Sequence, residues 1–267
     1  MLIGHRRSLV LLVAVTLIAP AAFANHSWNN YHWGRTANPF TLKVGNNMTS
    51  NWQSQFGTAV SDWTQSSVMN LTAVAGGSNK RCSAVSGTVQ VCNGRYGNNG
   101  WLGLAQIWLS GSHISQGTAK MNDSYFDTAT YNNPNEKLHV VCQEVGHTFG
   151  LGHTSEDGSS QNTCMDYFSN TGANAGSTLS THPNQHDYDQ LASIYQHLDS
   201  TSTIAGSTLP AGMTLPDFSD KANWGKLVSR SANGKSEVYE LDFGNGNKIL
   251  THVFWSDEVE DRGHDHP

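Results

Sequence analysis

The chain has 267 residues and a formal net charge of −6, and only 13% of its residues are charged. A net-acidic protein is a poor candidate for binding nucleic acid or an anionic membrane surface through its overall charge, so we expect neither partner. The length suits one main domain with a large core and a small appendage. We expect the chain to be a monomer.

The first 24 residues have the features of a secretory signal peptide. Residues 5–7 give a charged start, residues 8–20 are almost wholly apolar, and residues 22–24 form an A-x-A cleavage signature. A membrane anchor is the less favoured alternative, because the apolar run is too short to span a bilayer comfortably. We therefore expect a secreted protein, extracellular or periplasmic, whose mature chain begins near Asn25.

The remainder divides into a main domain at 25–199, a Ser/Thr/Gly/Pro linker at 200–217 and a small β-rich appendage at 218–267. Apolar residues recur at helical spacing from Trp52 to Trp63, which predicts a helix with one buried face. Strands are predicted at Phe40–Val44, Val68–Val74, Thr88–Val91, Leu104–Leu109 and Gly117–Phe126. In the appendage, strands are predicted at Lys226–Ser229, Glu237–Phe243 and Lys248–Trp255, with turns between them.

The most informative predicted helix begins at Pro134 and ends near Phe149. At 100° per residue it has an apolar face and an opposite polar face, so it packs one side on the core and turns the other toward a cleft. The apolar face carries Leu138, Val141, Cys142, Val145 and Phe149, and the polar face carries Gln143, Glu144 and His147. A second amphipathic helix is predicted from about Tyr188 to Leu198.

The four cysteines favour two disulfides, because an even number in an exported protein is typical of paired thiols. Three pairings are open. Proximity in the sequence favours Cys82 with Cys92, which leaves Cys142 with Cys164.

The polar face of the long helix has the spacing of a catalytic metal site. Gln143 and His147 stand at i and i+4, so their side chains project from one face about one turn apart. Glu144 beside them can take a proton from a metal-bound water. Gly150 permits a sharp exit from the helix, which lets His153 return as a third ligand. Three protein ligands and a water are typical of catalytic zinc.

The segment Gln143 to His153, QEVGHTFGLGH, resembles the metzincin metalloprotease motif H-E-x-x-H-x-x-G-x-x-H. It matches at the glutamate, the second and third histidines and the glycine, and it departs at the first ligand, which is Gln143. Residues 163–167, TCMDY, are similar to the family's Met-turn, with Met165 beneath the metal. Tyr167 matches the tyrosine that astacin-like and serralysin-like members place near zinc. From about Phe40 to Leu198 the order of elements resembles a matrixin-like catalytic domain.

The resemblance implies an α/β (α+β) fold in which a twisted mixed sheet packs on the zinc helix and a C-terminal helix. It implies a secreted zinc endopeptidase with Glu144 as general base and Tyr167 as a stabiliser of the oxyanion. It also implies a polypeptide substrate extended along an edge strand near His113–Asn122. Asp123 and Asp127 are candidate ligands for a structural Ca²⁺ ion in addition to Zn²⁺.

Two further expectations follow from the resemblance. If the Met-turn passes beneath the metal, Cys142 and Cys164 approach each other there and can form a disulfide, the alternative being two buried free thiols. The amide oxygen of Gln143 donates to zinc less strongly than an imidazole. The alternative function is therefore a catalytically weak or inactive module that binds peptides or polymers. Retention of Glu144 favours the protease, because a pure scaffold needs no base.

Overall fold

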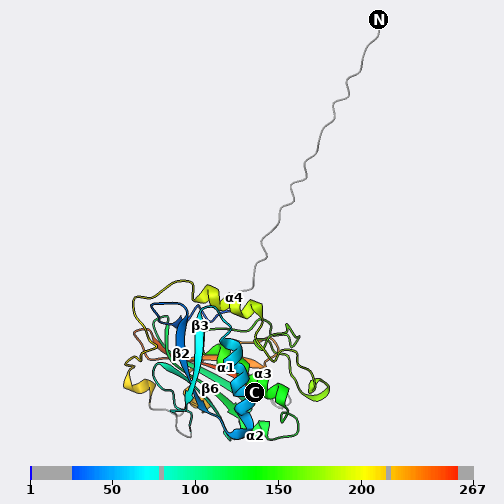
Figure 1. Cartoon of the computed structure of the whole chain (residues 1–267). Helices are drawn as coiled ribbons and strands as arrows, with labels where there is room; N and C mark the ends of the chain where they lie inside the picture. The colour runs from blue at the N-terminus through cyan, green and yellow to red at the C-terminus, as the bar shows by residue number, and fades with distance from the viewer. Residues whose placement is uncertain (2–25, 78–80, 215–217, 258–267) are drawn as a thin grey trace.

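The computed structural model describes Met1 and residues 26–77, 81–214 and 218–257. The expected signal peptide lies outside the described residues, apart from Met1. The chain has a mixed α/β architecture in which a few helices pack on one large sheet (Figure 1). Within the described part of the chain, no helix is long and apolar enough to cross a membrane.

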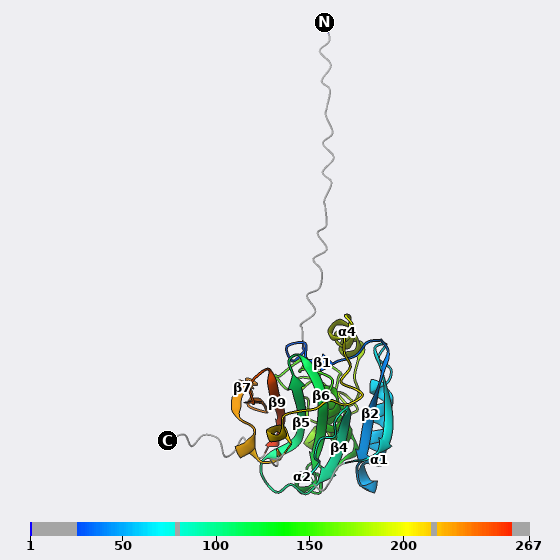
Figure 2. The same cartoon turned by 90° about the vertical axis from the view of Figure 1, so that its left-hand side faces the viewer.

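The sheet has nine strands and contains both parallel and antiparallel pairs. Its order is β3 (Met69–Ala75), β2 (Phe40–Asn47), β4 (Thr88–Gly94), β6 (His113–Asn122), β5 (Trp101–Ser110), β9 (Asn247–Trp255), β8 (Ser236–Asp242) and β7 (Lys226–Arg230), with β1 (His32–Trp33) paired to β6. The pairs from β3 to β6 are parallel and those from β6 to β7 are antiparallel. Figure 2 shows β6 and β5 between β4 and the C-terminal strands.

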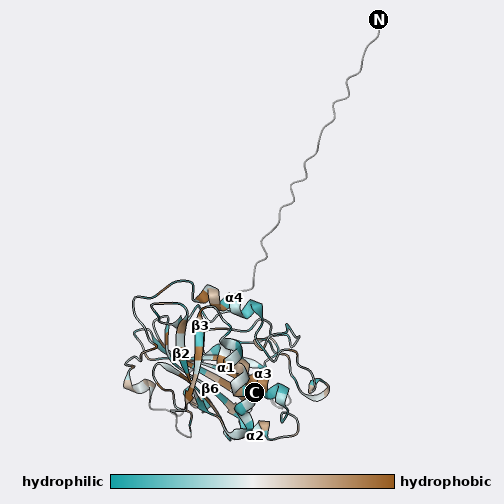
Figure 3. Cartoon of the chain, in the orientation of Figure 1, coloured by the Kyte–Doolittle hydropathy of each residue, from teal (hydrophilic) through white to brown (hydrophobic). Residues whose placement is uncertain are grey.

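The helices bury the faces that their apolar spacing predicts. A 3-10 turn (Ser50–Trp52) leads into α1 (Gln53–Trp63), which buries Phe56, Val60 and Trp63. The others are α2 (Asp123–Phe126), α3 (Pro134–His147), α4 (Gln185–Ile194) and three short 3-10 turns at Gly172–Asn174, Ala211–Met213 and Lys221–Asn223. Hydrophobic and hydrophilic residues are interspersed along these elements (Figure 3), as one buried side requires.

Helix α3 is held at its N-terminus by a side-chain cap. The side chain of Asn133 accepts a hydrogen bond from the backbone N–H of Glu136 at 2.8 Å, and Pro134 occupies the first turn. Both features stabilise a helix start, because they satisfy or avoid amide donors that have no partner within the helix. The last residue of α3 is His147, slightly before the predicted end near Phe149.

The strand expected at an edge lies inside the sheet. Strand β6, over His113–Asn122, has β5 on one side; on the other it pairs with β1 at His113–Ile114 and with β4 at Gly117–Asn122. The sheet therefore offers no free edge at these residues, and the expectation of an edge strand there is wrong. That expectation came from the resemblance, because the periodicity of a strand indicates its buried faces and not whether a neighbour flanks it. Binding of an extended polypeptide stays a prediction.

The C-terminal segment forms the three expected strands, and they continue the main sheet. Strand β9 pairs antiparallel with β5 along its whole length, from Asn247 opposite Ser110 to Trp255 opposite Trp101. Leu250 and Phe254 from β9 are buried in the main core together with residues of α1 and α3. Segment 218–257 is thus part of the same packed structure as the strands that precede the linker.

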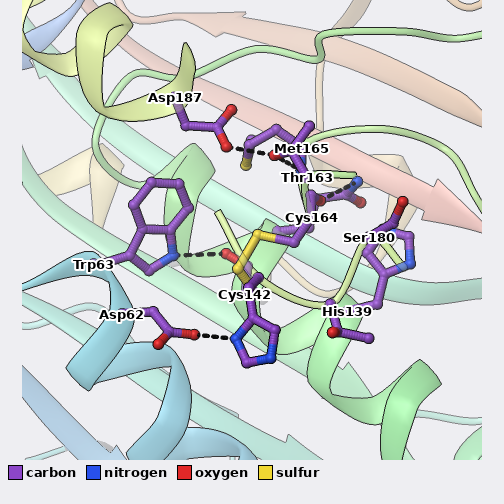
Figure 4. The surroundings of a disulfide bond; sticks show 12 residues. Asp62, Trp63, His139, Cys142, Thr163, Cys164, Met165, Ser180 and Asp187 are labelled. Atoms are coloured by element: carbon purple, nitrogen blue, oxygen red, sulfur yellow. Dashed lines mark hydrogen bonds and ion pairs between the residues drawn. A yellow bond between two sulfur atoms is a disulfide. The ribbon is translucent and has the colours of Figure 1, made fainter. Parts of the chain in front are cut away.

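The two disulfides have the pairing that proximity in the sequence favours. Cys82 bonds to Cys92, and Cys142 in α3 bonds to Cys164 in the loop that follows. The second bond ties α3 to the loop of Met165, beside the indole of Trp63 (Figure 4). The Trp63 indole N–H donates to the carbonyl of Cys142 at 3.0 Å, so α1 also holds this point of α3.

Candidate metal centre

Three histidines from separate segments meet beside α3. His147 ends the helix, His153 follows a turn, and His252 comes from β9. One ring nitrogen of each lies within 4.8 Å of one ring nitrogen of each of the others. The side chains of His147 and His252 are fully buried, and that of His153 is 4% exposed. The expected ligands His147 and His153 are therefore together, and a third histidine joins them.

Gly150 makes the return of His153 possible. Its φ of +94° lies in the region that favours glycine. A Cβ at this position would also lie 2.0 Å from the carbonyl oxygen of Tyr31, which is closer than atoms can approach. Both the turn and the neighbouring backbone thus require glycine between the two histidines.

Two of the histidines have buried nitrogens with no partner. Nδ1 of His147 lies 2.8 Å from the carbonyl oxygen of Leu151, which can only accept, so Nδ1 carries the proton. This leaves an unused lone pair on Nε2 of His147, which has no hydrogen-bond partner. Nε2 of His153 is likewise buried and without a partner, and it carries a lone pair in the tautomer whose Nδ1 donates to the Tyr167 hydroxyl oxygen, 2.9 Å away. Unused imidazole lone pairs of this kind fit a metal ion such as zinc.

The charge state of the three histidines suits metal binding. Burial lowers the pKa of His147 and of His252 well below 6.5 and that of His153 to about 3, and neighbouring histidines lower them further. The imidazoles are consequently neutral at neutral pH. A neutral imidazole is the form that ligates a metal, so no proton has to be displaced.

Glu144 is enclosed next to the histidines. Its side chain is fully buried, one carboxylate oxygen lies 3.5 Å from Nδ1 of His252, and the other has no partner. Gly103 of β5 makes room for it, because a Cβ there would lie 2.4 Å from Oε1 of Glu144. Burial raises the pKa of this carboxyl well above 4.5. A raised pKa makes the ionised carboxylate a stronger proton acceptor, which suits a general base.

The Gln143 amide is oriented by the loop beneath it. Its Nε2 donates to the carbonyl of Cys164 at 3.1 Å and to that of Asp166 at 2.8 Å. Since carbonyl oxygens only accept, the amide cannot be turned around. Its oxygen is left buried without a hydrogen-bond partner. Metal binding by Gln143 stays a prediction.

Met165 and Tyr167 lie where the loop contacts the site. Met165 is buried, and a Cβ added at Gly146 of α3 would lie 2.6 Å from its sulfur. The Tyr167 hydroxyl is 2.9 Å from Nδ1 of His153 and 3.3 Å from Nε2 of His252. Burial raises the pKa of Tyr167 well above 10, so the phenol keeps its proton. It is thus a hydrogen-bond donor within reach of the histidines.

His252 was not among the site residues expected from the sequence. It alternates in β9 with Leu250 and Phe254, and all three share the face that packs into the main core. A histidine between two inward-facing apolar residues of a strand is the signal that could have indicated it. Its distance in the sequence from the zinc helix concealed the connection.

The expected calcium ligands have protein partners. Asp123 accepts hydrogen bonds from the Trp52 indole at 2.9 Å and from Asn93, and Asp127 pairs with Arg95. Neither belongs to a group of potential metal ligands among the described residues. A structural calcium ion at these aspartates stays a prediction.

One side of the centre opens to a cleft. The cleft has a volume of about 420 Å³ and is bounded by the N-terminal segment, by the turn at His153 and by strands β7, β8 and β9. The indole of Trp28 stacks on the ring of His147 with 4.9 Å between centroids and an angle of 4°. Trp28 therefore covers His147, while His153 and Glu156 line the cleft.

Comparisons with known proteins add little to this picture. No family model matches the sequence, and no curated protein matches it significantly. The solved structure entitled "Structure of myroilysin" resembles the chain with a TM-score of 0.37 and 13% sequence identity, over 64% of this chain and 98% of that one. A TM-score this low does not establish a shared fold. The metal centre is therefore interpreted from its own geometry.

Removing the Cys142–Cys164 bond is expected to weaken both the fold and metal binding. The bond closes a loop of 22 residues, which the chain-entropy treatment values at roughly 3 kcal/mol. We expect Cys142→Ala/Cys164→Ala to lower the free energy of unfolding by about this amount and also to lower zinc affinity, because Gln143 and Met165 are adjacent to the two cysteines. Chemical denaturation and zinc titration measure the two effects.

The matched control removes the other disulfide. Cys82→Ala/Cys92→Ala opens a loop of 10 residues away from the histidines, so stability should fall while zinc affinity is unchanged. An equal loss of zinc affinity in both double variants would show that the Cys142–Cys164 bond has no specific role at the centre.

Proposed function

We propose that this chain is a secreted zinc-dependent endopeptidase that hydrolyses peptide bonds at the centre described above. The observation that carries the proposal is the meeting of His147 and His153, each with an unused buried nitrogen, next to the buried carboxyl of Glu144. Hydrolysis by a metal-activated water requires metal ligands next to a carboxyl that can accept a proton, and Oε1 of Glu144 has no hydrogen-bond partner. The two disulfides support export, since such bonds persist in oxidising compartments.

The residues of the chain have separate roles in this reaction. Zinc, when bound, supplies a Lewis acid and lowers the pKa of a bound water to about 7. Glu144 accepts the proton of the attacking water and passes it to the leaving amine, which its raised pKa favours. Tyr167, which stays protonated, donates a hydrogen bond to the oxyanion that develops on the scissile carbonyl.

A polypeptide is the substrate class that the cleft supports best. The cleft reaches His153 and is bordered by β7, β8 and β9, whose residues Val228, Val238 and Leu250 give it apolar contacts. An extended peptide can enter there without the interior strand β6. The buried environment excludes bulk water from Glu144, which strengthens its electrostatic interactions with the reacting groups.

A catalytically weak or inactive module that binds peptides or polymers is the second candidate function. One observation favours it: the side chains of Glu144 and His147 have no exposed surface in this structure, and Trp28 stacks over the second of them. Such a module would still use the cleft, and it would bind a peptide without cleaving it.

Metal removal tests the proposal directly. The purified mature chain is expected to hold about one zinc ion, as a single catalytic centre requires. Dialysis against a chelator should abolish casein hydrolysis, and stoichiometric zinc should restore it. Elemental analysis and a casein assay on the same samples measure both effects. Full zinc occupancy without cleavage of any protein substrate would favour the binding module, and the absence of bound metal after zinc is supplied would contradict the endopeptidase.

A further inference from the structure

The register of the C-terminal strands aims His252 at the metal centre. In β9, His252 lies opposite Ala105 of β5 and opposite Val238 of β8. Because side chains alternate along a strand, His252 shares its face with Leu250 and Phe254, which are buried in the main core. A strand paired on both sides cannot slip by one residue without turning these apolar side chains outward, so the histidine is held in place.

His252 is as close to the two expected histidine ligands as they are to each other. Its ring centroid lies 3.9 Å from that of His147 and 4.7 Å from that of His153, while the latter two are 4.6 Å apart. Its Nδ1 is 3.5 Å from Glu144 although the two residues are separated by 108 positions in the sequence. The three rings are therefore mutual neighbours beside Glu144, and one nitrogen of each lies within 4.8 Å of one nitrogen of each of the others.

A purely structural role for His252, as a buried and hydrogen-bonded histidine, explains this arrangement less well than metal binding does. His252 lies 3.3 Å from both the Ser236 hydroxyl and the Tyr167 hydroxyl, so it does have polar neighbours. The same small space, however, also contains the unpartnered nitrogens of His147 and His153. Burying several imidazole lone pairs without donors costs free energy, and one metal ion shared by the three rings removes that cost.

Gln143 is the weaker candidate for the same position. Structural and catalytic zinc sites are built from cysteine sulfur, histidine nitrogen and carboxylate oxygen, and an amide oxygen is a poorer donor. The NH₂ group of Gln143 donates to two carbonyls of the loop, those of Cys164 and Asp166, while its oxygen is buried without a partner. Together with the Cys142–Cys164 bond, these contacts tie the loop to α3.

We propose that His252 is the third protein ligand of the zinc ion, together with His147 and His153. The proposal rests on the proposed function only in taking zinc as the bound metal. Strand β9 then supplies a ligand to a centre whose other ligands lie on the opposite side of the linker. The three histidines leave a fourth position for water, and Gln143 is not required as a ligand.

Zinc affinity of single variants tests the proposal. We expect His252→Ala to weaken zinc binding by at least about 100-fold, beyond the 10- to 100-fold typical of losing an outer contact. Gln143→Ala should weaken it by less than about 10-fold, as befits a residue that orients a loop. His182→Ala, which removes a half-exposed histidine on the loop outside the centre, should change nothing. Competition with a chromophoric chelator measures each dissociation constant, and circular dichroism verifies the fold.

A second measurement covers the case in which His252→Ala does not fold. X-ray absorption of the zinc-loaded wild-type chain should fit three imidazole ligands. A fit with two imidazoles overturns the proposal, and so does a zinc affinity that falls more in Gln143→Ala than in His252→Ala. A His252→Ala variant that keeps zinc and cleaves casein faster would also overturn it, because His252 would then only cover the site.

The same experiments separate this proposal from the proposed function. Three imidazoles on zinc without casein hydrolysis would uphold His252 as a ligand and contradict the endopeptidase. Two imidazoles with chelator-sensitive hydrolysis would uphold the endopeptidase and reject His252. A wild-type chain that binds no zinc would reject both.

Discussion

In the proposed zinc endopeptidase, replacing Glu144 by glutamine is expected to slow peptide hydrolysis by orders of magnitude while zinc stays bound. Glutamine has the shape of glutamate, so it fits the space that Gly103 leaves open and should not disturb the fold. It cannot accept the proton of the attacking water. Since a general base contributes about 10²- to 10⁴-fold, we expect kcat to fall within that range. Casein or peptide cleavage, together with elemental analysis, measures the change.

Glu156 provides the matched control for this substitution. Its carboxylate is 3.6 Å from Nδ1 of His153 and its side chain is 45% exposed at the cleft, so it is also near the centre. Because the His153 imidazole is neutral, the half-exposed Glu156 carboxylate gains little from it, and Glu156→Gln should stay within about tenfold of the parent in kcat. Parent-like cleavage by Glu144→Gln, or an equally large loss in Glu156→Gln, would reject Glu144 as the base.

The parts of the centre that lie close together in the sequence could be predicted from it. Helical periodicity placed Gln143, Glu144 and His147 on one face of a helix, and the glycine at 150 indicated the turn that returns His153. These relations depend on backbone geometry over a few residues, which local pattern determines. The structure has the helix, the positive φ of Gly150 and the two histidines together.

Relations between distant segments could not be obtained in this way. The pairing of β9 with β5 joins strands on either side of the linker, and a strand pattern contains no information about its partner. For the same reason the resemblance implied an edge strand at His113–Asn122 that the pattern itself could not test, and the structure has an interior strand there. The motif also assigned Gln143 as a metal ligand by its position alone. The hydrogen bonds that Gln143 donates to two carbonyls depend on the loop at Cys164, which is remote in the sequence.

The position of β9 makes the C-terminal segment necessary for the fold itself. Strand β5 forms a long antiparallel ladder with it, interrupted only by a register shift between Trp101 and Gly103, and the side chains of Leu250 and Phe254 lie in the main core. The linker is also attached, because Thr203 accepts a hydrogen bond from the backbone N–H of Gly34 at 3.0 Å. If the residues before the linker were expressed alone, β5 would lack the strand it pairs with and part of the main core would be exposed to water.

A chain that ends at Asp199 is consequently expected to lose cooperative folding and zinc binding together. Deleting one large buried side chain costs about 2–5 kcal/mol, and the truncation removes Leu250 and Phe254 along with the backbone partners of β5. Natural domains are stable by only about 5–15 kcal/mol, so this loss is enough to unfold the protein. Thermal unfolding followed by circular dichroism measures the outcome.

Val228→Ala is the control, because Val228 is 51% exposed on β7 and its loss should change stability by less than about 0.5 kcal/mol. A truncated chain that still melts cooperatively would show that the strands before the linker form an independent domain, and retained tight zinc binding in that chain would remove His252 from the centre as well.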